Sequence, residues 1–130
     1  MNRLKRTQFW GKDEFDDSLI LQIIRGEKTA TACPSHLYYV PDGPCDDGGY
    51  ETGDVVEVYD LKEKLRCIIE ITEVYTTPFN NIPEKLWAGE CNKSAEEFRR
   101  EHRECWKEFE VTEDFEMTIN HFKLLKIVNK

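Results

Sequence analysis

A lysine and a threonine follow a glycine where the sequence predicts a helix to pass into a strand. In the segment RGEKTATACPSH, Gly26, Lys28 and Thr31 follow the pattern G-x-K-x-x-T. A threonine hydroxyl acts as a nucleophile only with a base nearby. A lysine amine can be that base only when burial or a neighbouring cation lowers its pKa well below about 10.4. Nucleophilic attack is therefore the chemistry that this pair could support.

The same residues also have a purely structural explanation. A lysine near a helix C-terminus is favourable by about 0.3–1 kcal/mol, and Thr29 and Thr31 suit a strand. In a regular strand Lys28 and Thr31 would point to opposite faces, because they are three residues apart. The catalytic interpretation therefore requires an irregular backbone at residues 27–29.

Two short Cys and His pairs could offer metal ligands. These are Cys33-x-x-His36 and His102-x-x-Cys105. Neither contains the CxxC knuckle of structural zinc sites, and a cysteine on an apolar helix face usually belongs to the core. We therefore expect no metal and no other cofactor. The odd number of cysteines, five, favours free thiols in a reducing compartment.

Composition limits the class of protein. The 130 residues suit a single domain over residues 1–130. The formal charge of -8 argues against strong non-specific binding to DNA, but it allows a small pocket for one nucleotide or a short RNA loop. No run approaches the roughly 20 apolar residues of a membrane helix, and the first ten residues lack the apolar core of a signal peptide. We expect a cytoplasmic protein without membrane contact, whose oligomeric state the sequence leaves open.

The elements that must position Lys28 and Thr31 begin with a helix over residues 13–26. Phe15, Leu19 and Ile23 recur four apart on its apolar face, and Gly26 is its expected left-handed end. A short strand should follow from Lys28. Residues 33–52, rich in Pro, Gly and Asp, should form a long surface loop.

Two strands and two further helices are expected next. The segments TGDVVEVYD and LRCIIEITEVY predict an antiparallel hairpin, with Glu73 on the inward face of Ile69 and Ile71. Pro83 can open a short helix that runs through Trp87. The capping-box spacing of Ser94 and Glu97 predicts a longer helix. Its apolar face should carry Phe98, His102, Cys105, Trp106 and Phe109.

The last segment, FEMTINHFKLLKIV, predicts one or two strands. Strands then outnumber helices, and the helices flank the strands rather than alternate with them. The fold class is α+β, with a small curled sheet or barrel and two main helices.

Several segments in this order resemble the ASCH domain family. They are FWG near the start, GEKTATA, IIEITEVYTTPF and GECNKSAEEFRREH, and the resemblance covers about residues 9–128. The resemblance implies a PUA-like fold, which is a curled antiparallel or mixed β-barrel with helices beside a cleft. It also implies binding of RNA or of a nucleotide. The insertion at residues 33–52 departs from the smallest relatives and leaves the substrate open.

Some small bacterial relatives are amidohydrolases that act on acylated cytidine. By position, the resemblance implies that Thr31 is the nucleophile, Lys28 the base and Glu90 the orienting carboxylate. Backbone N–H groups near Gly26 are candidate donors to the developing oxyanion. Other relatives are ribonucleases or non-catalytic RNA-binding modules, and both remain alternatives for this chain.

The resemblance also implies a binding surface on the longer helix. Family members place a histidine and basic residues near the cleft, here His102 with Arg99 and Arg103, where they could hold a phosphate or a base edge. A histidine satisfied at the core boundary is the alternative. Trp10 could stack on a base, which contributes about 1–3 kcal/mol, or could pack on the first helix. The expected ligand is RNA or a modified nucleoside.

Overall fold

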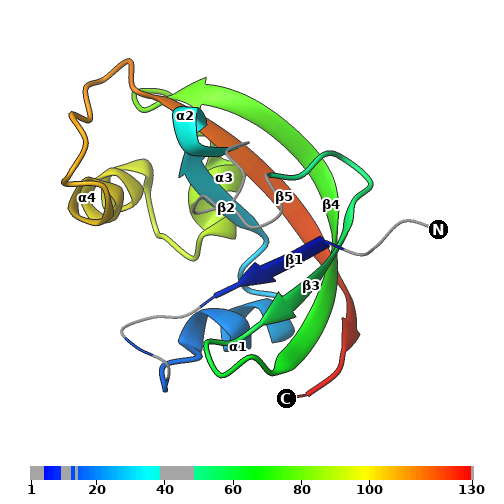
Figure 1. Ribbon diagram of the computed structural model, residues 1–130. Coiled ribbons are helices and arrows are strands. Elements are labelled where there is room, and N and C mark those ends of the chain that lie inside the picture. The colour runs from blue at the N-terminus through cyan, green and yellow to red at the C-terminus, as the bar shows by residue number, and fades with distance from the viewer. Residues whose placement is uncertain (1–4, 10–12, 14, 39–48, 130) are drawn as a thin grey trace.

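The computed structural model describes residues 5–9, 13, 15–38 and 49–129. Its strands form one curled sheet in the order β1-β3-β4-β5-β2, in which β1 runs parallel to β3 and the other neighbours are antiparallel (Figure 1). The strands are β1 (Lys5–Gln8), β2 (Ala30–Pro34), β3 (Val55–Tyr59), β4 (Leu65–Pro78) and β5 (Glu116–Ile127). The helices are α1 (Ser18–Ile24), α2 (Ser35–Tyr38), α3 (Glu84–Gly89) and α4 (Ala95–Cys105). This mixed half-barrel confirms the expected α+β class and curled sheet.

The curl comes from the two long central strands. The pairing of β4 with β5 shifts register between Ile68 and Ile69 and again between Ile71 and Glu73. Such bulges bend a strand and increase its twist. Figure 1 shows β4 and β5 curving along the whole sheet, with α1 near one end and α4 beside α3, away from α1. The two edge strands, β1 and β2, consequently face the same cavity from opposite sides.

The second bulge also explains why the expected orientation of Glu73 is wrong. Ile71 pairs with Phe122, but Glu73 pairs with His121, so Thr72 is an extra residue on β4. Directly paired residues share a face of an antiparallel sheet. Glu73 therefore lies on the opposite face from Ile71, and its side chain is 47% exposed and pairs with Lys85 at 2.8 Å.

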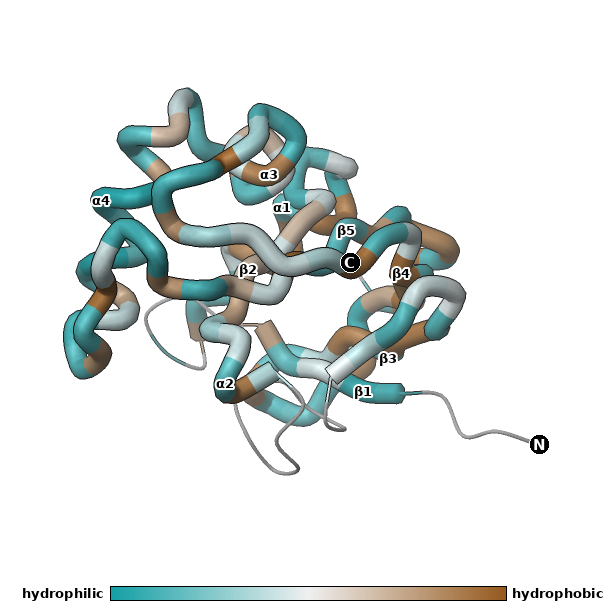
Figure 2. The backbone as a smooth tube through the Cα atoms, turned by 90° about the horizontal axis from the view of Figure 1, so that it is seen from above, coloured by the Kyte–Doolittle hydropathy of each residue, from teal (hydrophilic) through white to brown (hydrophobic). Residues whose placement is uncertain are grey.

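Each face of the sheet has its own apolar core. In Figure 2 the hydrophobic segments lie along β3, β4 and α3, whereas α4 is largely hydrophilic. One cluster packs α1 inside the curl and contains Ile20, Ile23, Tyr50, Val56, Val58, Cys67, Ile69, Ile71 and Phe122. The other packs α3 and α4 on the outside and contains Ala30, Phe79, Ile82, Leu86, Phe98, Met117 and Ile119.

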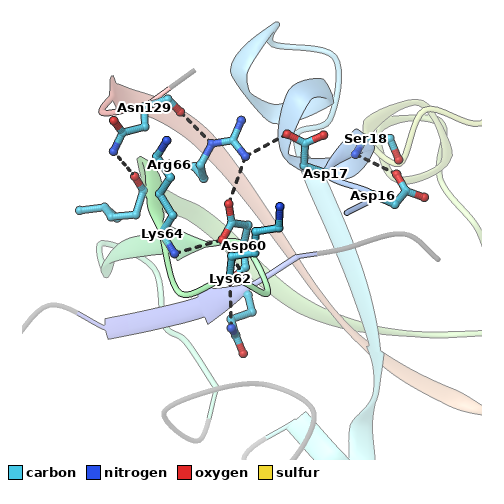
Figure 3. Close-up of polar contacts among 10 residues, drawn as sticks. Asp16, Asp17, Ser18, Asp60, Lys62, Lys64, Arg66 and Asn129 are labelled. Atoms are coloured by element: carbon cyan, nitrogen blue, oxygen red, sulfur yellow. Dashed lines mark hydrogen bonds and ion pairs between the residues drawn. The ribbon is translucent and has the colours of Figure 1, made fainter. Parts of the chain in front are cut away.

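A buried arginine joins the first helix to the hairpin and to the end of the chain. Arg66 Nη1 contacts Asp17 Oδ2 at 2.9 Å and Asp60 Oδ2 at 3.3 Å, and its Nε donates to Asn129 O at 2.9 Å (Figure 3). The other oxygen of Asp60 accepts the backbone N–H groups of the β3–β4 turn. One side chain thus fixes three parts of the fold.

The first helix is shorter than expected. It begins at Ser18 rather than at residue 13, and Phe15, placed on its apolar face by the periodicity, is 71% exposed. The side chains of Asp13 and Asp16 accept the N–H groups of Phe15 and Ser18. Such local turns compete with the helix for backbone hydrogen bonds. The left-handed Gly26, with φ of +78°, is confirmed.

The segment expected to be a surface loop is partly buried. Cys33 and Pro34 belong to β2, residues 35–38 form α2, and Tyr38 is fully buried. The centres of the Tyr38 and Tyr50 rings lie 6.5 Å apart in an edge-on contact, and Tyr50 belongs to the core inside the curl. Residues 39–48 lie outside the described part of the chain.

The cap by Ser94 and the final strand are confirmed, although the Glu97 carboxylate accepts the N–H of Lys93 rather than that of Ser94. The Glu97 N–H donates to Ser94 Oγ at 3.1 Å at the start of α4, and β5 is one continuous strand. Pro83 caps α3 as expected. Among the described helices, none has the length and apolarity needed to cross a membrane.

Candidate functional site

The turn after α1 buries Lys28. Glu27 and Lys28 both donate their backbone N–H to Gln22 O, at 2.8 Å and 3.1 Å, so the chain is still turning past Gly26. Residues 27–29 belong to neither helix nor strand, as the catalytic interpretation requires. The Lys28 side chain is 4% exposed and points to the C-terminal end of α3.

Glu90 is the partner of Lys28. Lys28 Nζ donates to Glu90 Oε1 at 2.9 Å and to Ala30 O at 2.8 Å. An ammonium has three donors, so one remains for a ligand. Glu90 caps α3, and the next residue, Cys91, adopts a left-handed φ of +65°.

His102 completes a chain of three charged side chains. Its Nε2 lies 3.1 Å from Glu90 Oε2, and its Nδ1 lies 2.8 Å from Phe98 O. Both neighbours can only accept a hydrogen bond when Glu90 is ionised, whereas a neutral imidazole has a single N–H. The doubly protonated imidazolium is therefore the form that satisfies both contacts.

The charges of the three groups support one another. Burial alone would raise the pKa of Glu90, but the Lys28 charge and the His102 hydrogen bond outweigh it and lower the pKa to about 2. Burial alone would lower the pKa of His102, but the hydrogen bond and charge of Glu90 outweigh it and raise that pKa. The resting site is thus an ionised carboxylate between two cations.

These three residues open on a cavity that Thr31 also lines. The outer cavity has a volume of about 480 Å³ and lies between α1, α4 and the edges of β1 and β2. The Thr31 hydroxyl makes no hydrogen bond within the described part of the chain, so it is free to meet a ligand. The lining residues are Gln8, Phe9, Leu19, Lys28, Thr31, Ala32, Glu90, Asn92, Glu101, His102, Cys105 and Trp106.

An inner cavity of about 160 Å³ continues past Thr31. It reaches the apolar floor formed by Ile69, Ile71 and Phe122. The residues common to both cavities are Gln8, Phe9, Thr31, Ala32 and Trp106. Thr31 therefore lies where the compartment that holds the charged side chains meets the one with the apolar floor.

The structure brings some of the expected site residues together and not others. Lys28, Thr31, Glu90 and His102 share the outer cavity, whereas Gly26 lines neither cavity and only shapes the turn. Trp10 lies outside the described residues.

Two of the three arginines of α4, Arg99 and Arg103, were expected beside His102. Neither lines the outer or the inner cavity. The Arg103 guanidinium lies 5.0 Å from the centre of the Phe79 ring, on the outer face of the sheet. Binding of a ligand by these two arginines therefore stays a prediction that these cavities do not support.

Eight of the residues that line the outer cavity were not predicted as parts of the site: Gln8, Phe9, Leu19, Ala32, Asn92, Glu101, Cys105 and Trp106. The Phe9 ring centre lies 5.7 Å from Lys28 Nζ, and the Trp106 ring lies 4.9 Å from the His102 ring. On α4, Cys105 and Trp106 carried a signal, because they follow His102 by three and four positions on one helix face.

The Cys and His pairs do not come together as a metal centre. His36 packs edge-on against Phe109 at 5.2 Å, and Cys33 is buried in β2. Across the described ranges, no three Cys, His, Asp or Glu side chains are grouped so that they could hold a metal ion.

Solved structures with the same fold come from several bacteria. Protein EF3133 from Enterococcus faecalis aligns with a TM-score of 0.76 at 17% identity, covering 98% of this chain and 79% of that one. An ASCH domain from Lactobacillus crispatus aligns with a TM-score of 0.73 at 23% identity, covering 94% and 80%. ASCH from Zymomonas mobilis aligns with a TM-score of 0.53 at 14% identity, covering 95% and 71%. At these identities the likeness shows the fold alone.

The sequence itself matches a known domain family. No curated protein matches the chain significantly. The family model of the ASCH domain matches residues 5–126, which span all five strands and four helices except the last residue of β5. The chain therefore belongs to the ASCH domain family, whose structures have a PUA-like fold.

Proposed function

We propose that this ASCH domain binds a nucleoside with an acylated amino group, of the acylated cytidine type, and hydrolyses its amide. The observation that carries the proposal is the shared cavity of Thr31 and the Lys28–Glu90 pair, at the point where the compartment with the charged side chains meets the one with the apolar floor. A polar heterocycle and a small acyl group would suit the two compartments, with the scissile amide near Thr31.

In the proposed reaction Thr31 Oγ attacks the amide carbonyl carbon and forms a C–O bond. The hydroxyl proton passes to Lys28 Nζ, which then gives it to the departing exocyclic nitrogen as the C–N bond breaks. Water next attacks the threonine ester, again with Lys28 moving the proton. This second step releases the carboxylic acid and restores the hydroxyl.

Lys28 must lose a proton before it can accept one from Thr31. Glu90 Oε1, 2.9 Å away, is the available acceptor, and return of the proton after turnover restores the ion pair. Because the resting pair is ionic, the neutral form is a minor state. A ligand that displaces water from the cavity would favour the neutral form of the Lys28–Glu90 pair, since charges are less stable in a dry site.

Binding of a base without cleavage is the second candidate. Phe9 and Trp106 line both cavities, and aromatic rings bind bases by stacking. The ionic resting state of Lys28 and Glu90 favours this candidate too, because it provides no ready base. Such a site could serve an RNA-binding module or a ribonuclease.

The test is incubation of the protein with N4-acetylcytidine and measurement of the cytidine released. Parent protein and Thr31→Ser should release cytidine, whereas Thr31→Ala should bind the substrate without releasing it. Thr29→Ala is the matched control, because Thr29 lies in the same segment but lines neither cavity. If the parent protein releases no cytidine but binds RNA in a salt-sensitive way, the hydrolase proposal is refuted and the RNA-binding candidate is supported.

A further inference from the structure

We propose that Glu101, held at the opening of the outer cavity by Asn92, makes the site select unphosphorylated nucleosides over nucleotides and RNA. Glu101 is a specificity-determining residue in this proposal, not a catalytic one. The inference rests on the proposed function, because it assumes that the outer cavity receives the polar part of a nucleoside.

Glu101 is fixed rather than free to swing into solvent. It is an exposed residue of α4 that also lines the outer cavity, which places it at the opening. Asn92 Nδ2 donates to both of its carboxylate oxygens, at 3.0 Å and 3.1 Å. Asn92 is 7% exposed, and its backbone N–H donates to Trp87 O at 2.8 Å. A buried amide thus holds an anionic group at the entrance.

The cations of this cavity are already neutralised. Lys28 and His102 are the positive residues of its lining, and both contact Glu90, at 2.9 Å and 3.1 Å. With Glu101, two cations face two carboxylates, so the formal charge of the lining is zero. Lys28 keeps one N–H donor for a ligand, but tight binding of a phosphate also needs positive charge that carboxylates do not already balance. The three arginines of α4, Arg99, Arg100 and Arg103, line neither cavity.

A carboxylate in this position discriminates by charge and by hydrogen bonding. It repels a phosphate that approaches within a few ångströms. It accepts hydrogen bonds from hydroxyl groups, as acidic residues do from ribose hydroxyls in dinucleotide-binding sites. Glu101 therefore suits the sugar of a free nucleoside and disfavours its phosphate esters.

The first experiment compares dissociation constants for N4-acetylcytidine and for its 5′- and 3′-monophosphates, measured with Thr31→Ala to prevent turnover. We expect both monophosphates to bind about tenfold more weakly, and the ratio to shrink at high salt. Glu101→Gln in the same background should bring the three constants closer together. Glu96→Gln is the matched control, because Glu96 is exposed on the same helix and lines neither cavity. Equal binding of a monophosphate, or a ratio that Glu101→Gln leaves unchanged, overturns the proposal.

The second experiment needs no nucleoside. Cys105 is exposed and lines the outer cavity, so its thiol reports the local potential. Cationic and anionic methanethiosulfonate reagents are compared by the rate at which each labels the Cys105 peptide, measured by mass spectrometry. The cationic reagent should react faster, and Glu101→Gln should reduce that preference while Glu96→Gln preserves it.

The two experiments separate the two possible failures. If no nucleoside binds, the proposed function fails, and the reagent preference alone decides whether Glu101 disfavours anions at this opening. If N4-acetylcytidine is hydrolysed but Glu101→Gln changes neither the binding ratio nor the reagent preference, the function stands and the role of Glu101 is refuted.

Discussion

The carbonyl oxygen of Gly89 accepts the backbone N–H of Thr29 at 2.8 Å. Gly89 directly precedes Glu90, and Thr29 directly follows Lys28. This one bond therefore holds the end of α3 against the turn after α1 and sets the separation of the Lys28–Glu90 pair. A Cβ atom on Gly89 would lie 2.8 Å from Ala30 Cβ and 3.0 Å from Thr29 Oγ1. The close approach requires a residue without a side chain.

Gly89→Ala should accordingly disturb both stability and the site. The added methyl group must push α3 away from β2, and overpacking of this kind costs about 1–3 kcal/mol. We expect a lower free energy of unfolding in urea and weaker nucleoside binding. Gly26→Ala is the comparison, because its φ of +78° disfavours alanine but nothing lies within 4 Å of the new atom. It should reduce stability by about 1–2 kcal/mol without lowering ligand affinity. An unchanged Gly89→Ala protein would contradict the packing argument.

Glu90→Gln should be far more disruptive than removal of an exposed acid. It leaves the buried Lys28 ammonium without its counter-ion and removes the acceptor of His102. Breaking a buried ion pair from one side costs about 3–5 kcal/mol, although the amide oxygen of Gln can recover part of that. Glu73→Gln is the control, since Glu73 and Lys85 form an exposed pair at 2.8 Å that should be worth less than about 1 kcal/mol. Urea unfolding of both variants at neutral pH checks the difference, and equal losses would refute it.

Local signals predicted the parts of the site that local geometry determines. Gly26 ends its helix as the sequence indicates, and the irregular turn that follows brings Lys28 into the cavity that Thr31 lines. The contact of Glu90 with His102 joins two separate helices, so helix periodicity alone could not predict it. The role of Glu90 in the site was predicted only from the family resemblance.

The errors have equally local causes. Nothing in the sequence of β4 marks Thr72 as a bulge, so strict alternation placed Glu73 on the wrong face. Arg103 lies over the Phe79 ring, whereas its neighbours Glu101 and His102 line the outer cavity, and nothing in the sequence of α4 marks which of these charged residues faces the cavity. The acidic, Gly- and Pro-rich composition of residues 33–52 gave no sign that Tyr38 and Tyr50 are buried.

The pH dependence of stability should identify the charged form of His102. Its pKa is raised in the folded protein, because the contacts with Glu90 outweigh burial. A raised pKa contributes stability that is complete below the unfolded value near 6.5 and is lost as the pH rises through the folded value. We expect the difference in unfolding free energy between parent and His102→Gln to be constant in mild acid and to shrink above neutrality.

His121 supplies a control of opposite sign. Burial lowers its pKa in the folded protein, and its Nε2 lies 2.8 Å from the Tyr75 hydroxyl. The stability that His121 contributes relative to His121→Gln should therefore grow as the pH rises from the lowered folded value to the unfolded value near 6.5, and be constant above it. Urea titrations from mild acid to mild alkali measure both differences. If the difference in unfolding free energy between parent and His102→Gln also grew with pH, His102 would not be an imidazolium in the folded protein.

Arg66→Met should show that the buried arginine holds the fold together away from the site. Arg66 is 7% exposed, and its loss leaves the carboxylate of Asp60, itself largely buried, without a cation. Two backbone N–H groups still satisfy Asp60 Oδ1, so we expect a loss of about 3 kcal/mol, at the lower end of the range for a broken buried pair.

Asp17→Asn should cost about 1 kcal/mol or less, because Asp17 is 37% exposed and Arg66 keeps Asp60 as its partner. The double variant Arg66→Met with Asp60→Asn should recover part of the loss, since no unpaired charge then remains buried. Urea unfolding of the parent, Arg66→Met, Asp60→Asn and the double variant forms a double-mutant cycle, and additive effects of the two changes would show that the two side chains are not coupled.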